Sequence, residues 1–549
     1  MSKNLGELSG RKGLKANLFE ALGIAAAGTG TPSVEKMEAL AGEFLMGKAN
    51  IFGTASFYDF LKEDNKGKKV FVCNGSACMT AGTQDSLREK LSTQFNADEI
   101  GEMCCLGRCY QNSAFNYAGK NYSGSAGDQI EEIKNQKSKV SDEYHVASYG
   151  TPVLTQAFTH VNEYYKILAT ALSQSPEALL AELKESGLRG RGGAGFPIAF
   201  KLDSCRNSAG RQKFIVCNAD EGDPGAYSDR YLMEQQPHSV LLGMMIAGYI
   251  AGADTGVLYI RAEYPESQEI IQDAINHLLD ENLLGENILG SGFNFNFKLI
   301  RAMGAYICGE ETALLSSIEG QRPEVRVRPP YPTQQGLFNK PTVVNNVETL
   351  ACIPYIIKNG GKQFASIGIG KSTGTKLVSL DGFFNRPGIY EVDMGTPLAV
   401  VIDELGGGFK QNIKAMHIGG PLGGLVPVEK IKDLAVDFES FSKNGFLLGH
   451  ASVVCIPQNF PVIKYLQHLF EFTAHESCGK CFPCRIGSTR GYEMIKKAQE
   501  TEYKIDRNLM NDLIETLEIG SLCALGGGLP LPVKNALQYF EEELSPYFK

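Results

Sequence analysis

Three closely spaced cysteines near the C-terminal end constrain this chain more than any other feature of its sequence. Cys478, Cys481 and Cys484 form the pattern C-x2-C-x2-C, and Cys523 follows further along. Three thiolates at this spacing can hold one face of a cubane cluster while a distant fourth completes it, as in [4Fe–4S] sites. A zinc site with four cysteine ligands is the alternative, but zinc modules usually combine two separate C-x2-C pairs. The pattern therefore favours a [4Fe–4S] cluster.

A second group of cysteines lies in the first quarter of the chain. Cys73 and Cys78 form one short pair, and Cys105 and Cys109 form another. Two such pairs suit a [2Fe–2S] cluster, in which each pair holds one iron, although zinc remains the alternative. Cys104 adjoins the second pair and competes as a ligand, but only Cys105 gives the x3 spacing. We therefore predict Cys105 as the ligand.

Overall composition narrows the class of protein. The net charge is −9 and the pI about 5.6, so nucleic acid and anionic membranes are not expected partners. The apolar stretch at residues 240–253 is shorter than the ~20 residues that a bilayer requires. Because the first residues also lack the apolar core of a secretory signal, we expect a cytoplasmic protein without membrane insertion.

Cysteine usage agrees with this location. In a reducing compartment, grouped cysteines are expected to bind metal or take part in redox chemistry rather than form disulfides. Isolated cysteines are common small core residues. We predict this core role for Cys205, Cys217, Cys308, Cys352 and Cys455.

Local patterns predict a multidomain α/β chain. Residues 14–61 read as a helical cap, with an apolar face through Met37, Leu40, Phe44 and Leu45. A strand at 69–72, a helix at 83–95 and a hairpin at 114–122 then predict a small α/β domain. Strand-like residues 213–217 and 256–260 alternate with a helix near 266–279, which predicts a largely parallel sheet.

The rest of the chain changes character twice. Residues 375–427 contain short strand-like runs between glycines and predict a mainly β insert, and residues 460–549 are helical again. The polar stretch around 135–148 is the best linker. The predicted parts are 1–135, the cap and small α/β domain; 136–150, the linker; 151–370, the large α/β domain; 371–455, the insert; and 456–549, the helical [4Fe–4S] domain.

A glycine-rich loop follows the helix that Ser175 and Pro176 open and that ends near Gly187. Residues 190–197 read Gly-Arg-Gly-Gly-Ala-Gly-Phe-Pro and contain a G-x-G-x-x-G pattern. Such glycines let the backbone approach a phosphate, but the Rossmann fingerprint requires a strand before the loop. An ordinary dinucleotide fingerprint is therefore not expected, and a merely flexible loop is the alternative for this motif alone.

Further motifs complete a recognisable set. Residues 217–225 read Cys-Asn-Ala-Asp-Glu-Gly-Asp-Pro-Gly, residues 304–312 Gly-Ala-Tyr-Ile-Cys-Gly-Glu-Glu-Thr, and residues 345–349 Asn-Asn-Val-Glu-Thr. With the glycine-rich loop and the Cys478 run, these segments resemble the NADH-binding flavoprotein subunit of complex I and the diaphorase subunits of NAD-dependent formate dehydrogenases and hydrogenases. The resemblance covers about residues 150–549, and the first 135 or so resemble the thioredoxin-like [2Fe–2S] subunit that accompanies that flavoprotein.

The resemblance implies a Rossmann-like domain that binds FMN and NADH, a ubiquitin-like β-grasp (SLBB) insert and a C-terminal helical bundle. The implied FMN-binding residues are Gly190, Arg191, Gly192, Gly193, Lys201, Asn218, Asp220, Glu221, Gly309, Asn345, Asn346 and Thr349. The implied NAD-binding residues are Phe196, Asp223, Tyr306, Glu310, Glu311 and Arg328. Acids beside the ribose predict a preference for NADH over NADPH, since they would repel a 2′-phosphate. The sequence departs from the family at Asp223, usually Glu, at Leu202, usually Trp, and at Arg328, usually Lys.

The expected function follows from these cofactors. Nicotinamide exchanges hydride and iron–sulfur clusters exchange single electrons, so a flavin is needed between them. We expect hydride transfer to the flavin, then one-electron transfer to a partner catalytic subunit. No segment resembles a molybdenum, nickel or quinone site. Formate dehydrogenase is the favoured partner type; a hydrogenase, with or without bifurcation, and complex I are alternatives, and a further ferredoxin-like subunit is compatible. A zinc-stabilised nucleotide-binding scaffold without redox activity is the alternative class.

Overall fold

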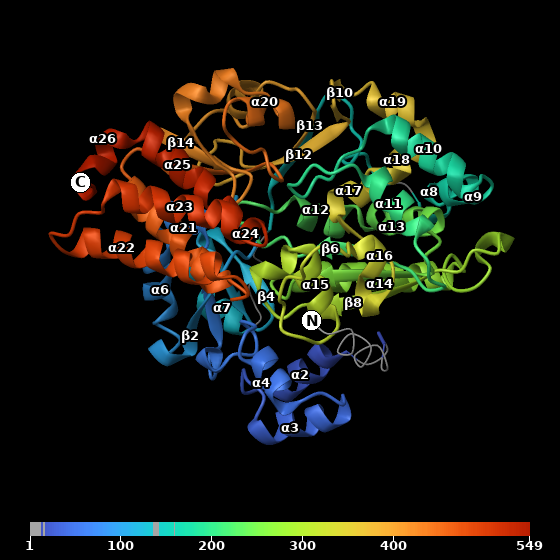
Figure 1. Cartoon of the computed structure of the whole chain (residues 1–549), viewed down its shortest axis with the longest axis horizontal. Coiled ribbons are helices and arrows are strands. Elements are labelled where there is room, and N and C mark those ends of the chain that lie inside the picture. The colour runs from blue at the N-terminus through green and yellow to red at the C-terminus, as the bar shows by residue number, and fades with distance from the viewer. Residues whose placement is uncertain (1–12, 15–16, 136–141, 159) are drawn as a thin grey trace.

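The computed structural model describes residues 13–14, 17–135, 142–158 and 160–549. The N-terminal residues 1–12, from which the absence of a secretory signal is predicted, and residues 136–141 of the predicted linker lie outside the described residues. Figure 1 shows N-terminal helices at the bottom, a central sheet, and C-terminal helices at the left.

A parallel sheet of four strands forms the centre of the large domain, in the order β8-β7-β6-β9. The prediction of a largely parallel sheet is confirmed. Cys217 of β6 lies opposite Asn345 of β9, and Asn218 lies opposite Asn346. These pairs are at the carboxyl ends of their strands, the edge where open α/β sheets bind ligands. The strands are β6 (Phe214–Ala219), β7 (Thr255–Ile260), β8 (Asn296–Arg301) and β9 (Thr342–Asn346).

Apolar helices cover one face of this sheet. The predicted apolar stretch forms α13 (Pro237–Ala251), almost all of whose side chains are buried. A Cβ atom at Gly243 would lie 1.9 Å from the carbonyl oxygen of Leu350, so glycine is needed for α13 to pack on α17 (Val347–Ala351). No helix within the described ranges is long and apolar enough to span a membrane. The other helices of this face are α9 (Lys166–Leu172), α10 (Pro176–Ser186), α11 (Ile198–Asn207), α12 (Ser228–Gln235), α14 (Pro265–Asp280) and α18 (Ile353–Asn359).

The N-terminal helices cover the opposite face. Leu18, Phe19 and Leu22 share one buried cluster with residues of β6, β7 and α15 (Glu311–Ile318). The predicted helical cap is thus present, but Leu45 does not belong to its apolar face: it is 62% exposed and has a positive φ just beyond the helix. The cap helices are α2 (Leu18–Ala26), α3 (Val34–Glu43) and α4 (Lys48–Ala55).

The predicted small α/β domain has a four-stranded sheet in the order β2-β1-β3-β4. β1 and β2 are parallel, whereas β3 and β4 form the predicted hairpin. Its elements are β1 (Val70–Cys73), α5 (Ser76–Thr80), α6 (Gln84–Leu91), β2 (Ile100–Met103), β3 (Phe115–Tyr117), β4 (Lys120–Tyr122) and α7 (Ile130–Lys134).

A mixed sheet of six strands follows in the order β15-β14-β16-β12-β13-β5. Its edge strand β5 lies within the predicted linker 136–150 and pairs in parallel with β13. Here the structure differs from the prediction, because an exposed edge strand needs main-chain hydrogen bonds but no apolar period. The strands are β5 (His145–Tyr149), β12 (Thr375–Leu380), β13 (Gly388–Asp393), β14 (Ile413–Ile418), β15 (Gly424–Pro427) and β16 (Ser452–Pro457).

The C-terminal region is helical, as predicted, and Leu517 lies in its buried cluster. A short π-helical segment, Pro483–Gly487, carries one of the predicted cluster ligands. The helices are α21 (Val462–Glu476), α22 (Ser488–Glu500), α23 (Arg507–Gly520), α24 (Ala524–Gly528), α25 (Pro530–Tyr539) and α26 (Glu541–Leu544). Shorter elements elsewhere are α8 (Val161–Tyr164), α16 (Pro332–Gln335), α19 (Gly361–Ala365), β10 (Gly368–Ile369), β11 (Ser372–Thr373) and α20 (Phe438–Lys443).

Candidate functional site

The glycine-rich loop connects α10 to α11 and closes on itself. Arg189 and Pro197 form an isolated bridge, and the amide of Gly190 donates a hydrogen bond of 2.8 Å to the carbonyl of Phe196. Gly193 has a φ of 120°, a conformation that favours glycine. A helix precedes the loop, as the sequence predicts, so its geometry differs from the Rossmann fingerprint.

This loop lies against the carboxyl end of β9. A Cβ atom at Gly192 would be 2.8 Å from Cβ of Asn346, and the amide of Arg191 donates to Oγ1 of Thr349 at 2.8 Å. Asn346 caps α17 by accepting from the amide of Thr349, and its Nδ2 donates to Asp229 at 2.7 Å. The structure therefore brings these predicted FMN residues together.

The charged guanidinium of Arg191 is buried in the protein and is held by backbone carbonyls. Its side chain is fully buried and donates to the carbonyls of Arg189 and Thr373 at 3.2 Å and 2.6 Å. Burial lowers the pKa of this guanidinium. The side chain thus fixes the loop, and the glycine-rich backbone is the part left to approach a phosphate.

The segment at 218–225, hereafter the acidic loop, begins with the last two residues of β6 and continues beyond the strand. Nδ2 of Asn218 donates to the carbonyl of Gly309 at 2.8 Å, which joins the acidic loop to the segment before α15. Glu221 accepts hydrogen bonds from the amides of Asp229 and Arg230 at 2.9 Å and 3.1 Å, at the start of α12. Glu221 is therefore occupied in positioning the loop.

Nδ2 of Asn345 and Oδ2 of Asp220 are buried polar atoms that lack hydrogen-bond partners within the described part of the chain. Buried polar atoms are normally paired, so these atoms fit a polar ligand such as FMN. Burial raises the pKa of Asp220 well above its ordinary range. When bound, FMN would supply the conversion between hydride and single-electron transfer.

The cations and acids predicted to bind FMN and NAD form a connected set of ion pairs. Nζ of Lys201 lies 2.9 Å from Glu311 and also donates to the carbonyl of Val344 at 3.1 Å. Arg328 contacts Glu311 at 2.8 Å and Glu310 at 3.4 Å. Glu310 additionally caps α15. The acids predicted to bind ribose are thus already paired with cations.

Asp223 and Tyr306, both predicted NAD residues, are in direct contact. The hydroxyl of Tyr306 donates to Oδ1 of Asp223 at 2.6 Å. On the other side, Nε2 of His450 lies 2.7 Å from Oδ2 of Asp223. The sequence reasoning missed His450, because it lies far along the chain and belongs to none of the recognised motifs.

Two exposed aromatic rings lie at the end of the glycine-rich loop and the start of α11. Phe196, a predicted NAD residue, is 45% exposed, and its ring meets that of Phe200 edge-on at 5.5 Å. Phe200 is 64% exposed and was also missed by the sequence reasoning. Exposed aromatic rings suit stacking on a nucleotide base.

The four cysteines predicted to bind [4Fe–4S] gather in one cluster of side chains. Cys478 and Cys484 are buried, while Cys481 and Cys523 are partly exposed and pack against the same cluster. Burial raises the pKa of the Cys484 and Cys523 thiols to about 11 and about 12, and their cysteine neighbours add to the effect. Within the described residues these thiols do not form a ready-made metal site. Desolvated thiols that act on one another electrostatically nevertheless fit a cluster whose iron would replace their protons.

The four cysteines predicted to bind [2Fe–2S] are all buried. The sulfurs of Cys105 and Cys109 are 3.5 Å apart. A hydrogen bond with Cys78 lowers the pKa of Cys73 to about 7, assisted by the amides of Gly75 and Leu106. Amides directed at sulfur fit the acceptor-rich ligands of an iron–sulfur cluster.

Cys104 differs from these ligands. It is only partly buried and packs on two neighbouring clusters of apolar side chains, whereas Cys105 faces Gly75, next to the Cys73–Cys78 pair. Cys105 also has a positive φ of 36°, which marks the turn that separates its side chain from that of Cys104. These positions favour Cys105 over Cys104, and its role as the ligand stays a prediction.

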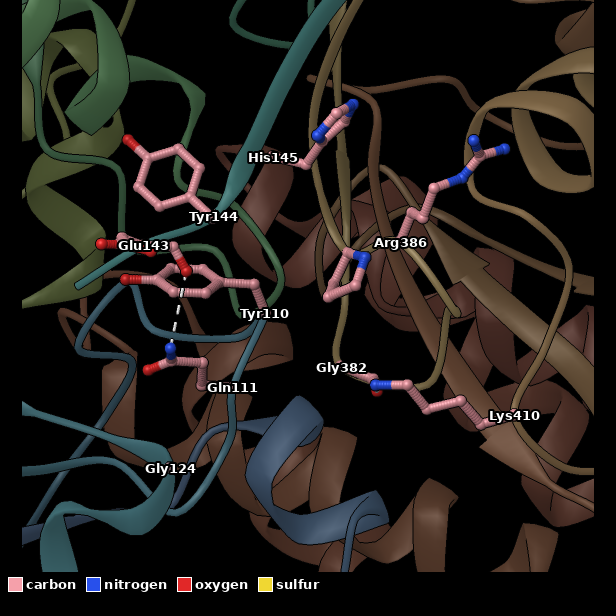
Figure 2. A pocket seen from close by; sticks show the side chains of 10 residues that line it. Tyr110, Gln111, Gly124, Glu143, Tyr144, His145, Gly382, Arg386 and Lys410 are labelled. Carbon is pink, nitrogen blue, oxygen red and sulfur yellow. Dashed lines mark hydrogen bonds between the residues drawn. The ribbon is translucent and has the colours of Figure 1, made fainter. Parts of the chain in front are cut away.

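A cavity of about 610 Å³ lies elsewhere, between the small α/β domain and the six-stranded sheet. Figure 2 shows Tyr110 and Tyr144 on one side of it and Arg386 and Lys410 on the other. None of the predicted FMN or NAD residues lines this cavity. It adjoins the [2Fe–2S] region, because Tyr110 follows Cys109 directly.

Comparisons with protein families find three regions in the chain. Residues 183–355 match the "Nuo51 FMN-binding domain", residues 464–547 the "NADH-ubiquinone oxidoreductase-F iron-sulfur binding region", and residues 7–137 the "Thioredoxin-like [2Fe-2S] ferredoxin". These regions contain the predicted FMN loop and both predicted sets of cysteines.

Curated relatives extend this match. The NADP-reducing hydrogenase subunit HndC of Solidesulfovibrio fructosivorans is 43% identical over 384 residues, which cover 69% of this chain and 78% of HndC. An NADH-quinone oxidoreductase subunit of Rhizobium meliloti is 40% identical over 383 residues, 69% of this chain and 91% of the relative. The chain belongs to the family of these FMN-binding NADH-quinone oxidoreductase subunits. Its predicted cofactors, FMN, [4Fe–4S] and [2Fe–2S], are confirmed, and it is a flavin and iron–sulfur oxidoreductase subunit.

A solved structure covers almost the whole of this oxidoreductase chain. A chain of the NAD+-reducing [NiFe]-hydrogenase in the H2-reduced state superimposes with a TM-score of 0.85 at 29% identity, over 96% of this chain and 93% of the other. The same enzyme in its air-oxidized state gives a TM-score of 0.85 at 28% identity. The multidomain α/β architecture with a thioredoxin-like domain is therefore confirmed.

Proposed function

We propose that this chain is the diaphorase subunit of a larger oxidoreductase, in which it interconverts hydride transfer with NAD(H) and one-electron transfer to a catalytic partner. The acidic loop carries this proposal. Asn218 and Asp220 are proposed FMN residues, the Tyr306 hydroxyl donates to Asp223, and the amide of Gly225 donates to Sγ of Cys109 at 3.3 Å. One short segment thus joins residues proposed for the flavin, nucleotide and [2Fe–2S] sites, which supports the proposal.

The proposed residue roles follow the motifs. FMN is held by Gly190, Arg191, Gly192, Gly193, Lys201, Asn218, Asp220, Glu221, Gly309, Asn345, Asn346 and Thr349, with Arg191 and Glu221 acting by fixing their loops. NAD(H) contacts Phe196, Asp223, Tyr306, Glu310, Glu311 and Arg328. The metal ligands are Cys478, Cys481, Cys484 and Cys523 for [4Fe–4S], and Cys73, Cys78, Cys105 and Cys109 for [2Fe–2S].

Exposed apolar side chains beside Cys481 and Cys523 support an electron exit at the [4Fe–4S] cluster. A Cβ atom at Gly520 would lie 2.8 Å from Cγ of Pro483, so the two segments that carry these side chains are adjacent. Clustered exposed apolar residues favour a protein interface. They are Phe482, Ile486, Ile519 and Leu522, which are 71%, 46%, 75% and 45% exposed.

The partner is best sought among hydrogenase-type catalytic subunits. HndC is by name a hydrogenase subunit, and the superimposed chain belongs to an NAD+-reducing hydrogenase. The formate dehydrogenase partner expected from the sequence stays a prediction, as do the cytoplasmic location and a further ferredoxin-like subunit. The six-stranded sheet is proposed to be the SLBB module, with a packing role, and the C-terminal helices the [4Fe–4S] bundle.

Reduction of ferricyanide by NADH in flavin-replete protein tests this function. A diaphorase is expected to turn over this acceptor without its catalytic partner, because the flavin and the clusters lie in one chain. Flavin-replete protein without activity would contradict the proposal. Colourless protein that contains zinc rather than iron would instead favour the nucleotide-binding scaffold.

A further inference from the structure

Asp223 lies between a tyrosine and a histidine that come from distant parts of the chain. Tyr306 belongs to the segment before α15, and His450 to the loop before β16. Both contacts are short, at 2.6 Å and 2.7 Å, and all three side chains are largely shielded from solvent. A Cβ atom at Gly420 would lie 2.5 Å from Oδ1 of Asp223, so the six-stranded sheet closes over this carboxylate.

The charges of His450 and Asp223 depend on each other. Burial opposes protonation of His450, but the Asp223 carboxylate outweighs it and raises the pKa of the imidazole. Burial likewise opposes ionisation of Asp223, yet His450 and the hydrogen bond from Tyr306 lower the pKa of that carboxyl. The pair is therefore an imidazolium and a carboxylate, with no net charge, until His450 loses its proton.

We propose that His450 is a positioning residue whose charge offsets that of Asp223 and thereby sets the relative affinity of the site for NADH and NAD+. This inference rests on the proposed function, in which Asp223 and Tyr306 contact the nicotinamide nucleotide. His450 acts through Asp223 and is not assigned a contact with the substrate.

The direction of the effect follows from the charges of the two nucleotides. NAD+ has a cationic ring, so NADH carries one more negative charge than NAD+ does. An uncompensated carboxylate at Asp223 disfavours NADH more than NAD+. The ratio of the dissociation constants of NADH and NAD+ is therefore low while His450 is charged and rises when it becomes neutral.

Other groups face this pair from the surrounding elements. Glu221 raises and Lys376 lowers the pKa of His450, while Arg261 contributes to the low pKa of Asp223. His417 on β14 lies within range of Asp223, and burial lowers its pKa to about 4, so it stays neutral near pH 7. Glu476 accepts a hydrogen bond from the amide of Tyr306, and burial raises its pKa to about 8. Because these groups are unchanged in His450 variants, their contributions cancel when variants are compared.

Two substitutions separate charge from packing. His450→Gln removes the charge at every pH, and His450→Lys supplies a cation over a wider pH range. Inhibition constants of NAD+ and of tetrahydro-NAD, a neutral-ring analogue of NADH that transfers no hydride, give the ratio at pH values from about 6 to about 9, with NADH and ferricyanide as substrates. The wild-type ratio is expected to rise roughly three- to tenfold across this range. His450→Gln should give a high, flatter ratio, and His450→Lys a low one.

His277→Gln, an exposed substitution on α14, is the matched control and should follow the wild type. A wild-type ratio that does not change with pH, or a folded His450→Gln protein with the wild-type profile, would overturn the inference. A wild-type protein that contains FMN but does not oxidise NADH would instead contradict the proposed function.

Discussion

The amide of Gly225 donates a hydrogen bond of 3.3 Å to Sγ of Cys109. Gly225 ends the acidic loop, which begins at the proposed FMN residue Asn218, and Cys109 is a predicted ligand of the [2Fe–2S] cluster. A Cβ atom at Gly225 would approach Val454 to 2.5 Å, so the loop needs glycine at this point. The small N-terminal domain is thus hydrogen-bonded directly to the large α/β domain, through a segment that also carries proposed FMN residues.

The choice between neighbouring cysteines can be tested by substitution. Cys105→Ser should remove the [2Fe–2S] signal in electron paramagnetic resonance and lower the iron content by about two atoms per chain. Cys104→Ser should leave both unchanged, because Cys104 packs against apolar neighbours. Loss of the signal in Cys104→Ser, with Cys105→Ser unaffected, would reverse the assignment.

Glu311 is expected to control the choice of nucleotide. It lies between Lys201 and Arg328, at 2.9 Å and 2.8 Å, and so neutralises two cations at the predicted ribose site. Glu311→Gln should free those cations for a 2′-phosphate and raise the ratio of kcat/KM for NADPH to that for NADH roughly tenfold. Glu177→Gln, which breaks an exposed ion pair with Arg206, serves as the control. An unchanged ratio would argue against a ribose site here.

A buried ion pair joins the six-stranded sheet to α17, beside the proposed FMN residues. Lys376 on β12 pairs with Glu348 on α17, and both side chains are almost completely buried. Because Asn345, Asn346 and Thr349 flank Glu348, Lys376→Met should cost about 3–5 kcal/mol of stability and reduce FMN retention. The double variant with Glu348→Gln should recover much of the loss. Equal losses in the single and double variants, by thermal unfolding and flavin release, would contradict this coupling.

His417 should make the protein sensitive to acid. Its Nδ1 lies 2.8 Å from the hydroxyl of Tyr465, and burial lowers its pKa to about 4. Below the unfolded value of about 6.5, the unfolded chain binds a proton that the folded chain does not. The buried neutral His417 therefore costs no stability above about pH 6.5. As the pH falls towards 4, the free energy of unfolding declines by up to about 3 kcal/mol.

Thermal unfolding at about pH 7 and pH 5 measures this effect. His417→Gln should lose less stability between the two values than the wild type, whereas His160→Gln, an exposed substitution, should match the wild type. An identical pH dependence in all three proteins would exclude His417 as a source of acid sensitivity. The other buried histidines with pKa lowered by burial, His238 and His468, act in the same direction.

The sequence predicted which residues belong to the candidate sites better than it predicted which of those residues contact one another. The cysteine spacings and the glycine-rich loop identified most of the candidate residues because each motif lies within a few residues of the chain. The register of β6 and β9 explains why Asn218 and Asn346 then meet. This register depends on long-range strand pairing, which local patterns do not encode.

His450 and β5 show what the sequence could not provide. His450 contacts Asp223 from more than two hundred residues away, and a single histidine in a loop has no spacing pattern. β5 is an exposed edge strand, so main-chain pairing with β13 forms it without an apolar alternation. In both cases the decisive interaction is tertiary.

Stopped-flow reduction of the Cys481→Ser protein by NADH tests the central claim most directly, that this chain converts hydride into single electrons. Cys481 is a partly exposed ligand of the proposed exit cluster. The variant should still bleach its flavin with NADH but should lose at least tenfold of its electron transfer to the native catalytic partner. Cys78→Ser, which removes a [2Fe–2S] ligand instead, should retain that transfer. Full transfer to the partner by folded Cys481→Ser protein that lacks the [4Fe–4S] cluster would contradict the account.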